Sequence, residues 1–142
     1  MAKLNPYLNF DGKTEEAFNF YKSVLGGEFL MLQRFRDTSY GDKMSEEDKN
    51  KIMHVALPVG ENILMGTDTM ESMGQRLRSG NNFSLSIEAE SEEEADRLFN
   101  NLSEGGKVEM PMEKTFWDAY FGMFVDKFGI QWMINFDLKK KP

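Results

Sequence analysis

The order of elements predicted for the first half of the chain occurs again in the second half. Glu15-Glu16-Ala17 aligns with Glu93-Glu94-Ala95, 78 residues further on, and each predicted helix ends at a Gly-Gly pair. A repeat of this length indicates duplication of one supersecondary unit. Because one unit alone would leave a face of its sheet uncovered, the repeat predicts two units that pair their sheets.

The first half reads as one strand, one helix and three further strands. Polar Asn5, Tyr7 and Asn9 alternate with apolar Leu8 and Phe10, which is the period of two typical of a half-buried strand. Apolar residues then recur at helical spacing until Gly26-Gly27, a stop that helices favour. The predicted elements are strands at 4–10, 28–36, 52–59 and 62–69, a helix beginning at 14, and a charged loop without periodicity at 37–51.

The second half follows the same pattern. Phe83, Leu85 and Ile87 alternate with polar residues and predict a strand. Ser91 opens a helix, and its hydroxyl is expected to form a capping box with Glu94. The remaining predicted elements are strands at 107–112, 119–125 and 130–136.

The composition argues against a nucleic-acid partner. The chain has 24 acidic and 17 basic residues, a formal charge of −7 and a pI near 4.8. A phosphate backbone would therefore meet net repulsion. The cluster Lys139-Lys140-Lys141 before Pro142 is interpreted as a solvated tail.

The absence of cysteine limits both the chemistry and the compartment. It excludes disulfides, thiolate metal ligands and a cysteine nucleophile. The N-terminal residues contain no apolar stretch long enough for a signal sequence, and no later run approaches membrane-spanning length. We expect a cytoplasmic protein with no membrane partner.

Two stretches of the chain resemble a known family. Residues 5–12, followed by Glu16-Ala17-Phe18, resemble the opening of PhnB-like proteins of the vicinal oxygen chelate superfamily, which includes glyoxalases, bleomycin-resistance proteins and extradiol dioxygenases. Residues 115–135, which include Tyr120-Phe121-Gly122 and Phe128-Gly129, resemble the C-terminal signature of these proteins more specifically. The likeness extends over nearly the whole chain.

The resemblance implies an α+β fold of two tandem βαβββ modules whose curved sheets form a cup. The modules would be residues 1–69 and 82–137 of a single domain spanning 1–142, and the cup would be completed in a homodimer. Some family members carry a demethylubiquinone methyltransferase label. No glycine-rich nucleotide loop follows a first strand here, so we do not expect that activity.

The resemblance also gives the positions of a metal site. In metal-using members of the superfamily, histidine, glutamate or glutamine at four cup-facing positions holds one divalent ion as a Lewis acid. The matching positions here are Asn5, Met65, Asn82 and Met133. Methionine is neutral and soft, and asparagine offers a carbonyl oxygen, so these residues are poor ligands for zinc, nickel or ferrous iron. We expect no cofactor, with a non-standard divalent metal as the alternative.

Strand parity predicts which side chains line the cup. If Asn5 faces the cup, Tyr7 and Asn9 do so as well. In the third strand, Met53, Val55, Leu57 and Val59 would form a uniformly apolar face, which assigns His54 to the other face. The predicted lining contains Tyr7, Asn9, His54, Tyr120, Phe124, Gln131, Met133 and Asn135, with Trp132, Ile134 and Phe136 packed beneath.

His54, the single histidine, is the first candidate for a general base or a substrate anchor. Its charge can change near neutral pH without a perturbed pKa. A half-buried histidine that is hydrogen-bonded to a neighbouring strand is an equally weighted alternative. Asp68 would either orient His54 or cap the turn before Met70, and we favour the cap.

Trp117 and Asp118 lie in a connection that could close over a ligand. Exposed loop aromatics bind apolar or planar groups, although Trp117 plugging a sheet edge or a dimer seam is the favoured alternative. The candidate ligand-binding residues are Tyr7, Asn9, His54, Asp68, Trp117, Tyr120 and Asn135.

Three functions stay open at this point. The first is a metal-free protein that binds a small, partly apolar or planar molecule in a dimeric cup. The second is an enzyme of isomerase or lyase type that uses His54 as its base, with or without a non-standard divalent metal. The third is an interaction module with no small ligand.

Overall fold

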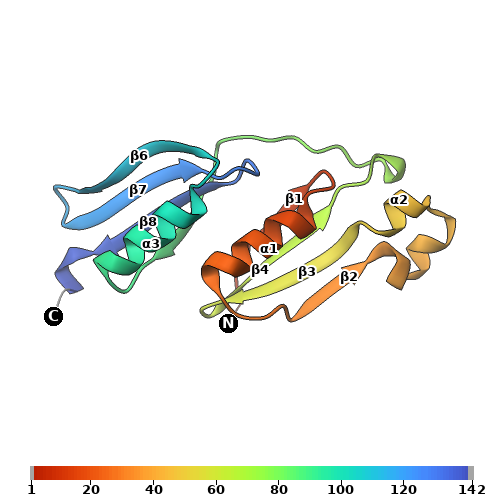
Figure 1. Cartoon of the computed structure of the whole chain (residues 1–142), viewed down its shortest axis with the longest axis horizontal. Helices are drawn as coiled ribbons and strands as arrows, with labels where there is room; N and C mark the ends of the chain where they lie inside the picture. The colour runs from red at the N-terminus through yellow and green to blue at the C-terminus, as the bar shows by residue number, and fades with distance from the viewer. Residues whose placement is uncertain (1, 141–142) are drawn as a thin grey trace. The chain divides into compact units, whose positions relative to one another are not determined.

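The computed structural model describes residues 2–140 and divides the chain into two compact units (Figure 1). Unit 1 spans Met1–Arg78 and unit 2 spans Ser79–Pro142. The modules expected at 1–69 and 82–137 fall within these units, and their union in a single domain stays a prediction. Met1, Lys141 and Pro142 lie outside the described residues, and with them the end of the basic tail.

Unit 1 is a four-stranded mixed sheet with α1 packed on one face (Figure 1). The strand order is β1-β4-β3-β2, with β1 parallel to β4 and the other neighbours antiparallel. The predicted helix and the third strand are confirmed, whereas β1 and β2 are shorter than predicted. The elements are β1 (Tyr7–Phe10), α1 (Thr14–Leu25), β2 (Met31–Arg34), β3 (Ile52–Val59) and β4 (Asn62–Asp68).

Unit 2 repeats this arrangement with α3 on one face of its sheet (Figure 1). The strand order is β5-β8-β7-β6, and only β5 and β8 are parallel among the neighbouring pairs. Two four-stranded mixed sheets, each with a helix, confirm the predicted α+β class. Within residues 2–140, no helix is long and apolar enough to cross a membrane. The elements are β5 (Leu85–Glu88), α3 (Glu92–Leu102), β6 (Lys107–Lys114), β7 (Ala119–Val125) and β8 (Gln131–Asp137).

The segment 37–51 differs from the prediction of a loop. Asp37 Oδ2 accepts a hydrogen bond from the Arg34 N–H at 2.9 Å, and Ser45 Oγ accepts one from the Asp48 N–H at 3.2 Å. Such local bonds stabilise helical turns that are too short to show an apolar period. The short elements here are η1 (Phe35–Asp37), η2 (Ser39–Lys43) and α2 (Glu46–Lys49), and η3 (Glu71–Met73) and η4 (Leu138–Lys140) occur elsewhere.

The start of α3 confirms half of the expected capping box. Ser91 Oγ accepts a hydrogen bond from the Glu94 N–H at 3.0 Å. The Glu94 carboxylate, however, accepts from the N–H of Glu90 at 2.9 Å, one residue before the N-cap. The cap therefore fixes the chain that leads into the helix as well as its first turn.

The core of unit 1 lies between α1 and one face of the sheet. Ala17, Phe18 and Tyr21 of α1 are fully buried, and Phe10 of β1 packs edge-on against Phe18. A Cβ at Gly66 of β4 would lie 2.5 Å from Cε1 of Phe18. Gly66 therefore leaves the space into which the Phe18 ring fits, and α1 approaches the sheet closely.

The predicted apolar face of β3 is wrong at its first residues. Val55 and Leu57 are buried as expected, but Met53 and Val59 are only half-buried, and Ile52 is buried in place of Met53. The register with β2 shifts at this point. Such an irregularity breaks the strict alternation of faces on which the prediction relied.

Asp68 is a buried carboxylate that joins three elements of unit 1. It is 3% exposed and lies at the end of β4. Its Oδ1 accepts hydrogen bonds from the N–H of Thr14 at 3.1 Å and from the hydroxyl of Thr14 at 2.7 Å, while Oδ2 accepts from the N–H of Ile52 at 2.8 Å. Asp68 therefore holds the start of α1 against the start of β3.

This placement corrects both roles expected for Asp68. Phe10, which Asp68 opposes in the parallel pair of β1 and β4, is buried on the α1 side of the sheet. Asp68 shares that face, so it neither orients His54 nor caps the turn before Met70. Its carboxylate accepts from the N–H of Thr14 at the start of α1 and from the N–H of Ile52 at the start of β3, and sequence spacing cannot reveal such distant partners.

Asp68→Asn is expected to destabilise the fold strongly. The two backbone N–H groups bond to different carboxylate oxygens, so an amide would place its NH2 against one of them and leave that donor unpaired. We expect the free energy of unfolding to fall by about 3 kcal/mol, measured by urea denaturation.

The exposed Asp42→Asn is the matched control for this substitution. It removes the same charge from the surface and is expected to change the free energy of unfolding by less than about 0.5 kcal/mol. Equal effects of the two substitutions would show that Asp68 does not join α1 to the sheet.

Candidate functional site

The face of the unit 1 sheet opposite α1 carries two rows of side chains that run across the strands. Strand register pairs Asn9 with Thr67, and His54 with Gln33. Thr67 is one residue beyond the Val55–Gly66 pair and bonds to the carbonyl of Met53 at 2.7 Å, which brings it beside His54. We call Asn9, Thr67, His54 and Gln33 the polar row, and Tyr7, Met65, Ala56 and Met31 the apolar row.

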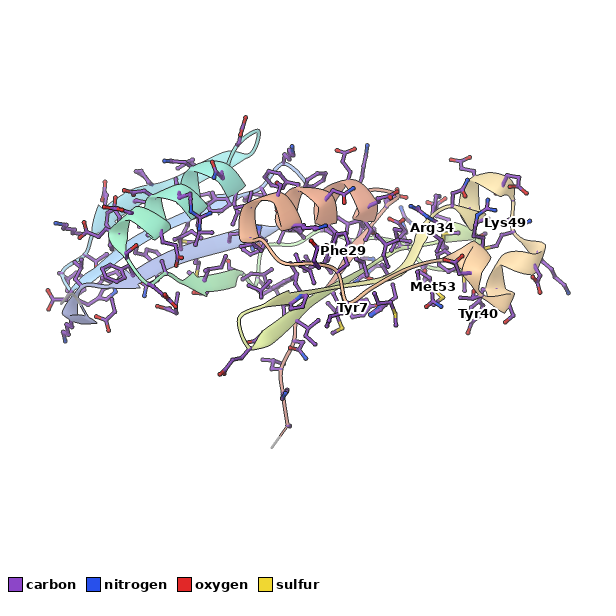
Figure 2. The ribbon with its side chains drawn as sticks, turned by 60° about the horizontal axis from the view of Figure 1, so that its bottom comes forward. Tyr7, Phe29, Arg34, Tyr40, Lys49 and Met53 are labelled. Carbon is purple, nitrogen blue, oxygen red and sulfur yellow. The ribbon has the colours of Figure 1, made fainter. Side chains whose placement is uncertain are left out.

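A hydrogen bond connects the two rows. The hydroxyl of Tyr7 lies 3.1 Å from Nδ1 of His54, and the two ring centroids are 5.6 Å apart. Figure 2 shows Tyr7 on the side of the sheet away from α1, and 45% of this side chain is exposed. The structure thus brings together two predicted ligand-binding residues that are 47 positions apart in sequence.

The chemistry of this pair depends on where its protons lie. Burial raises the pKa of Tyr7 above its ordinary value, and a hydrogen bond with Thr67 partly offsets this effect. Tyr7 therefore remains a phenol at neutral pH. When its hydroxyl donates to Nδ1 of His54, the neutral imidazole carries its proton on Nε2, where it can donate to a ligand oxygen.

The predicted faces of β1 and β8 are confirmed. Leu8 and Phe10 are buried, whereas Tyr7 and Asn9 are exposed. In β8, the three residues predicted to pack beneath the sheet are buried, and the residues between them are half-buried. Thr67 belongs to the site but was not predicted. The parity of the strand at 62–69, counted from Met65, would have identified it.

The uncovered face of the unit 2 sheet carries Asn135. Its Nδ2 donates a hydrogen bond at 2.8 Å to Oε2 of Glu88, the residue that it opposes on β5. Phe121 of β7 opposes Asn135 on the other side. The amide of Asn135 therefore lies between a carboxylate and an aromatic ring.

The prediction that Tyr120 and Phe124 line this uncovered face is wrong. Phe124 is fully buried against Phe99 of α3, with ring centroids 5.2 Å apart. Tyr120 donates from its hydroxyl to Oδ1 of Asp96 on α3 at 2.6 Å. The register of β7 with β8 places both residues opposite buried positions, which assigns them to the helix-covered face.

Trp117 lies at an exposed aromatic turn between β6 and β7. Trp117 is 52% exposed and the neighbouring Phe116 is 95% exposed, with ring centroids 4.8 Å apart. Asp118 has a φ of 61°, an uncommon conformation for a residue other than glycine. Trp117 also contacts the ring of Phe121, with centroids 6.4 Å apart, and so borders the uncovered face of unit 2.

The residues at the expected metal positions do not suit a divalent ion. Oδ1 of Asn5 already accepts a hydrogen bond from the Ile63 N–H at 2.9 Å. Met65 and Met133 offer only thioethers, and Asn82 offers an amide. Within residues 2–140, no three or more His, Cys, Asp or Glu side chains are grouped to hold an ion. These four positions therefore do not offer the histidine, glutamate or glutamine donors of the metal-using members.

Sequence comparisons identify relatives over nearly the full chain. The family described as 3-demethylubiquinone-9 3-methyltransferase matches residues 2–135. The chain is 35% identical over 147 residues to Protein YjdN of Escherichia coli strain K12, covering 98% of this chain and 97% of that protein.

Comparison with solved structures also finds relatives that cover nearly the full chain. Protein PA1353 from Pseudomonas aeruginosa is 40% identical with a TM-score of 0.86, covering 96% of this chain and 98% of that one. A putative 3-demethylubiquinone-9 3-methyltransferase, PhnB protein, from Bacillus cereus is 26% identical with a TM-score of 0.77, covering 95% and 99%. A glyoxalase/bleomycin resistance protein/dioxygenase family enzyme from Burkholderia phytofirmans PsJN, 20% identical, shares the fold with a TM-score of 0.59 and coverage of 93% and 97%.

The contact between Tyr120 and Asp96 predicts an alkaline titration. The Asp96 carboxylate raises the pKa of Tyr120 from 10.0 to about 12. The stability that this bond contributes is complete below pH 10 and is lost as the pH rises through 12, because the folded state holds the proton more tightly. We expect the phenolate absorbance of Tyr120, assigned by difference from Tyr120→Phe, to appear only as the pH approaches 12. Asp96→Asn should move it towards pH 10, and an unchanged titration would contradict the contact.

Proposed function

Because the chain belongs to the 3-demethylubiquinone-9 3-methyltransferase family, in its PhnB-like branch with the glyoxalase/bleomycin-resistance fold, we propose that it binds a small molecule on the uncovered face of unit 1. The ligand would be partly apolar or planar, and no divalent metal would hold it. The observation that supports this proposal is the hydrogen bond of 3.1 Å between Tyr7 and His54 on that face. Family membership by itself indicates no specific activity.

The two rows suit a ligand with one polar edge. The apolar row offers the ring of Tyr7 and the thioethers of Met65 and Met31, which adapt to irregular or planar groups. The polar row offers amide, hydroxyl and imidazole groups, which fix the orientation of a ligand by a few directed bonds. Carbonyl or hydroxyl oxygens on the polar edge would accept from Nε2 of His54.

A thermal-shift screen of metabolites and antibiotics tests this proposal. A ligand present at a hundred times its Kd should stabilise the protein by about 2.7 kcal/mol. Tyr7→Phe removes one hydrogen-bonding hydroxyl and should weaken binding by about 1 kcal/mol. His54→Ala should weaken binding further, because it removes the group that Tyr7 holds in place.

Tyr40→Phe is the matched control, since Tyr40 is an exposed tyrosine of η2, outside both rows. It should bind like the unchanged protein. A screen with no stabilising compound, or equal losses in Tyr7→Phe and Tyr40→Phe, would contradict the proposal.

A second candidate function is an enzyme of isomerase or lyase type with His54 as its base. The observation that favours it is the same contact with the other tautomer of His54, in which Nδ1–H donates to the Tyr7 oxygen and Nε2 keeps a free lone pair that can take a proton. The proposed reaction class is proton abstraction from a bound small molecule. A non-standard divalent metal belongs to this candidate alone.

Turnover of the compounds that bind in the screen distinguishes the two candidates. His54→Gln keeps a hydrogen-bonding side chain but cannot take up a proton, so an enzyme should lose about a hundredfold or more in kcat while still binding the compound. Elemental analysis of protein purified without chelator tests for metal. Undiminished turnover in His54→Gln would rule out His54 as the base.

Two further expectations belong to this proposal. Two exposed apolar residues, Met31 at the start of the edge strand β2 and Leu30 just before it, support a homodimer. Light scattering coupled to gel filtration measures the mass in solution, and a monomer at high concentration would contradict the homodimer.

The cytoplasm is the proposed location, with no nucleic-acid or membrane partner.

A further inference from the structure

Three methionines form one row across three strands of unit 2. Met133 of β8 opposes Met123 of β7, and Met123 opposes Met110 of β6. Side chains at such directly opposed positions have Cβ atoms about 5 Å apart. Met123 therefore lies between two other thioethers, and we call these residues the methionine row.

All three side chains belong to the face opposite α3. In β8, the neighbours of Met133, Trp132 and Ile134, are buried. In β7, Phe124 packs on Phe99 of α3, so Met123 points the other way. Met110 shares the face of the residue that it opposes.

Two irregularities in β6 bring Met110 into this row. The register with β7 shifts between Val108 and Met110, and again between Met110 and Glu113. Without them, Met110 and Met112 would share a face, but the sulfur of Met112 lies 2.7 Å from the position of a Cβ on Gly122, on the α3 side. Strand irregularities of this kind commonly redirect a side chain towards a functional surface.

The methionine row is not core filling. Among the methionines of residues 2–140, Met70 in unit 1 is buried at 1% exposure, whereas Met110 is 43% exposed and the other two are half-buried. Thioethers that a solute can reach, on flexible unbranched side chains, can converge on one point without movement of the backbone.

We propose that the methionine row binds a single soft monovalent cation, Cu(I). Thioethers are neutral soft ligands that select Cu(I) over divalent ions such as zinc or magnesium. The same property makes Met65 and Met133 unsuitable for the divalent ion expected at the superfamily positions. The fold would thus have kept a ligand at the position of Met133 while changing the class of ion.

Two carboxylates lie in one of the rows beside the methionine row, and one lysine, Lys107 opposite Val125, lies in the row on the other side. Glu113 opposes Phe121 in the neighbouring row of the same face, and Glu88 lies beyond Asn135 in that row. The whole chain carries a formal charge of −7. Because the thioethers leave the charge of the ion uncompensated, nearby carboxylates lower the cost of binding it.

Titration with Ag(I), a soft monovalent ion that air does not oxidise, tests the proposal on the full-length protein. The 11 methionines are labelled with carbon-13 at their methyl groups and followed by NMR. We expect the resonances of Met110, Met123 and Met133 to shift together and to saturate at one equivalent. Anaerobic competition with a chromogenic Cu(I) chelator then measures the Kd for Cu(I).

Met123→Leu should weaken Cu(I) binding by about tenfold or more, equivalent to about 1.4 kcal/mol. The matched control is Met73→Leu, an exposed methionine of unit 1, which should leave the Kd unchanged. Met110→Leu gives a second test on an edge strand, where the substitution does not disturb the core.

Two results would overturn the proposal. One is the absence of a joint shift of the three resonances. The other is an equal shift of exposed Met31 and Met73, which would show an adventitious ion only. Tyr7 and His54 lie in unit 1, so ligand binding there and Ag(I) binding here succeed or fail separately.

Discussion

The buried carboxylate of Asp68 is the interaction on which the arrangement of unit 1 depends. It accepts hydrogen bonds from Thr14 and Ile52, so the first turn of α1, the start of β3 and the end of β4 meet at one charged group. The helix is thereby held on one face of the sheet. The opposite face of the sheet carries Tyr7 and His54. These side chains could not reach a ligand if a helix covered them.

Strand register converts this two-faced sheet into a chemical surface. The parallel pairing of β1 with β4 sets Tyr7 beside Met65 and Asn9 beside Thr67, and a contact of 3.1 Å to His54 joins the two rows. In unit 2, the same principle gives a row of three thioethers. Duplicated units therefore present different chemistry, because substitution on an uncovered face leaves the packing under the helix intact.

The sequence predicted the elements better than it predicted their faces. The bounds of α1, β3 and β7 agree with the prediction because the helix has clear stops and the strands have strong periodicity. The predicted faces were wrong where the period is interrupted, as at Met53 beside a register shift. They were also wrong where one strand had to be aligned without a known partner strand, as at Tyr120. The prediction for Asp68 was wrong for another reason, because its hydrogen-bond partners are distant from it in the sequence.

The sequence by itself determined the duplicated α+β architecture, the family and the unsuitability of the expected metal positions for a divalent ion. The architecture follows from periodicity and stop signals, which are local properties of the chain, whereas the family and the metal positions follow from the resemblance of residues 5–12 and 115–135 to PhnB-like proteins. Tertiary structure alone decided that Tyr7 bonds to His54, that Tyr120 belongs to the helix side, and that Met110, Met123 and Met133 stand in one row. The physical reason is that cross-strand neighbours are set by register and by strand irregularities, which no local pattern encodes.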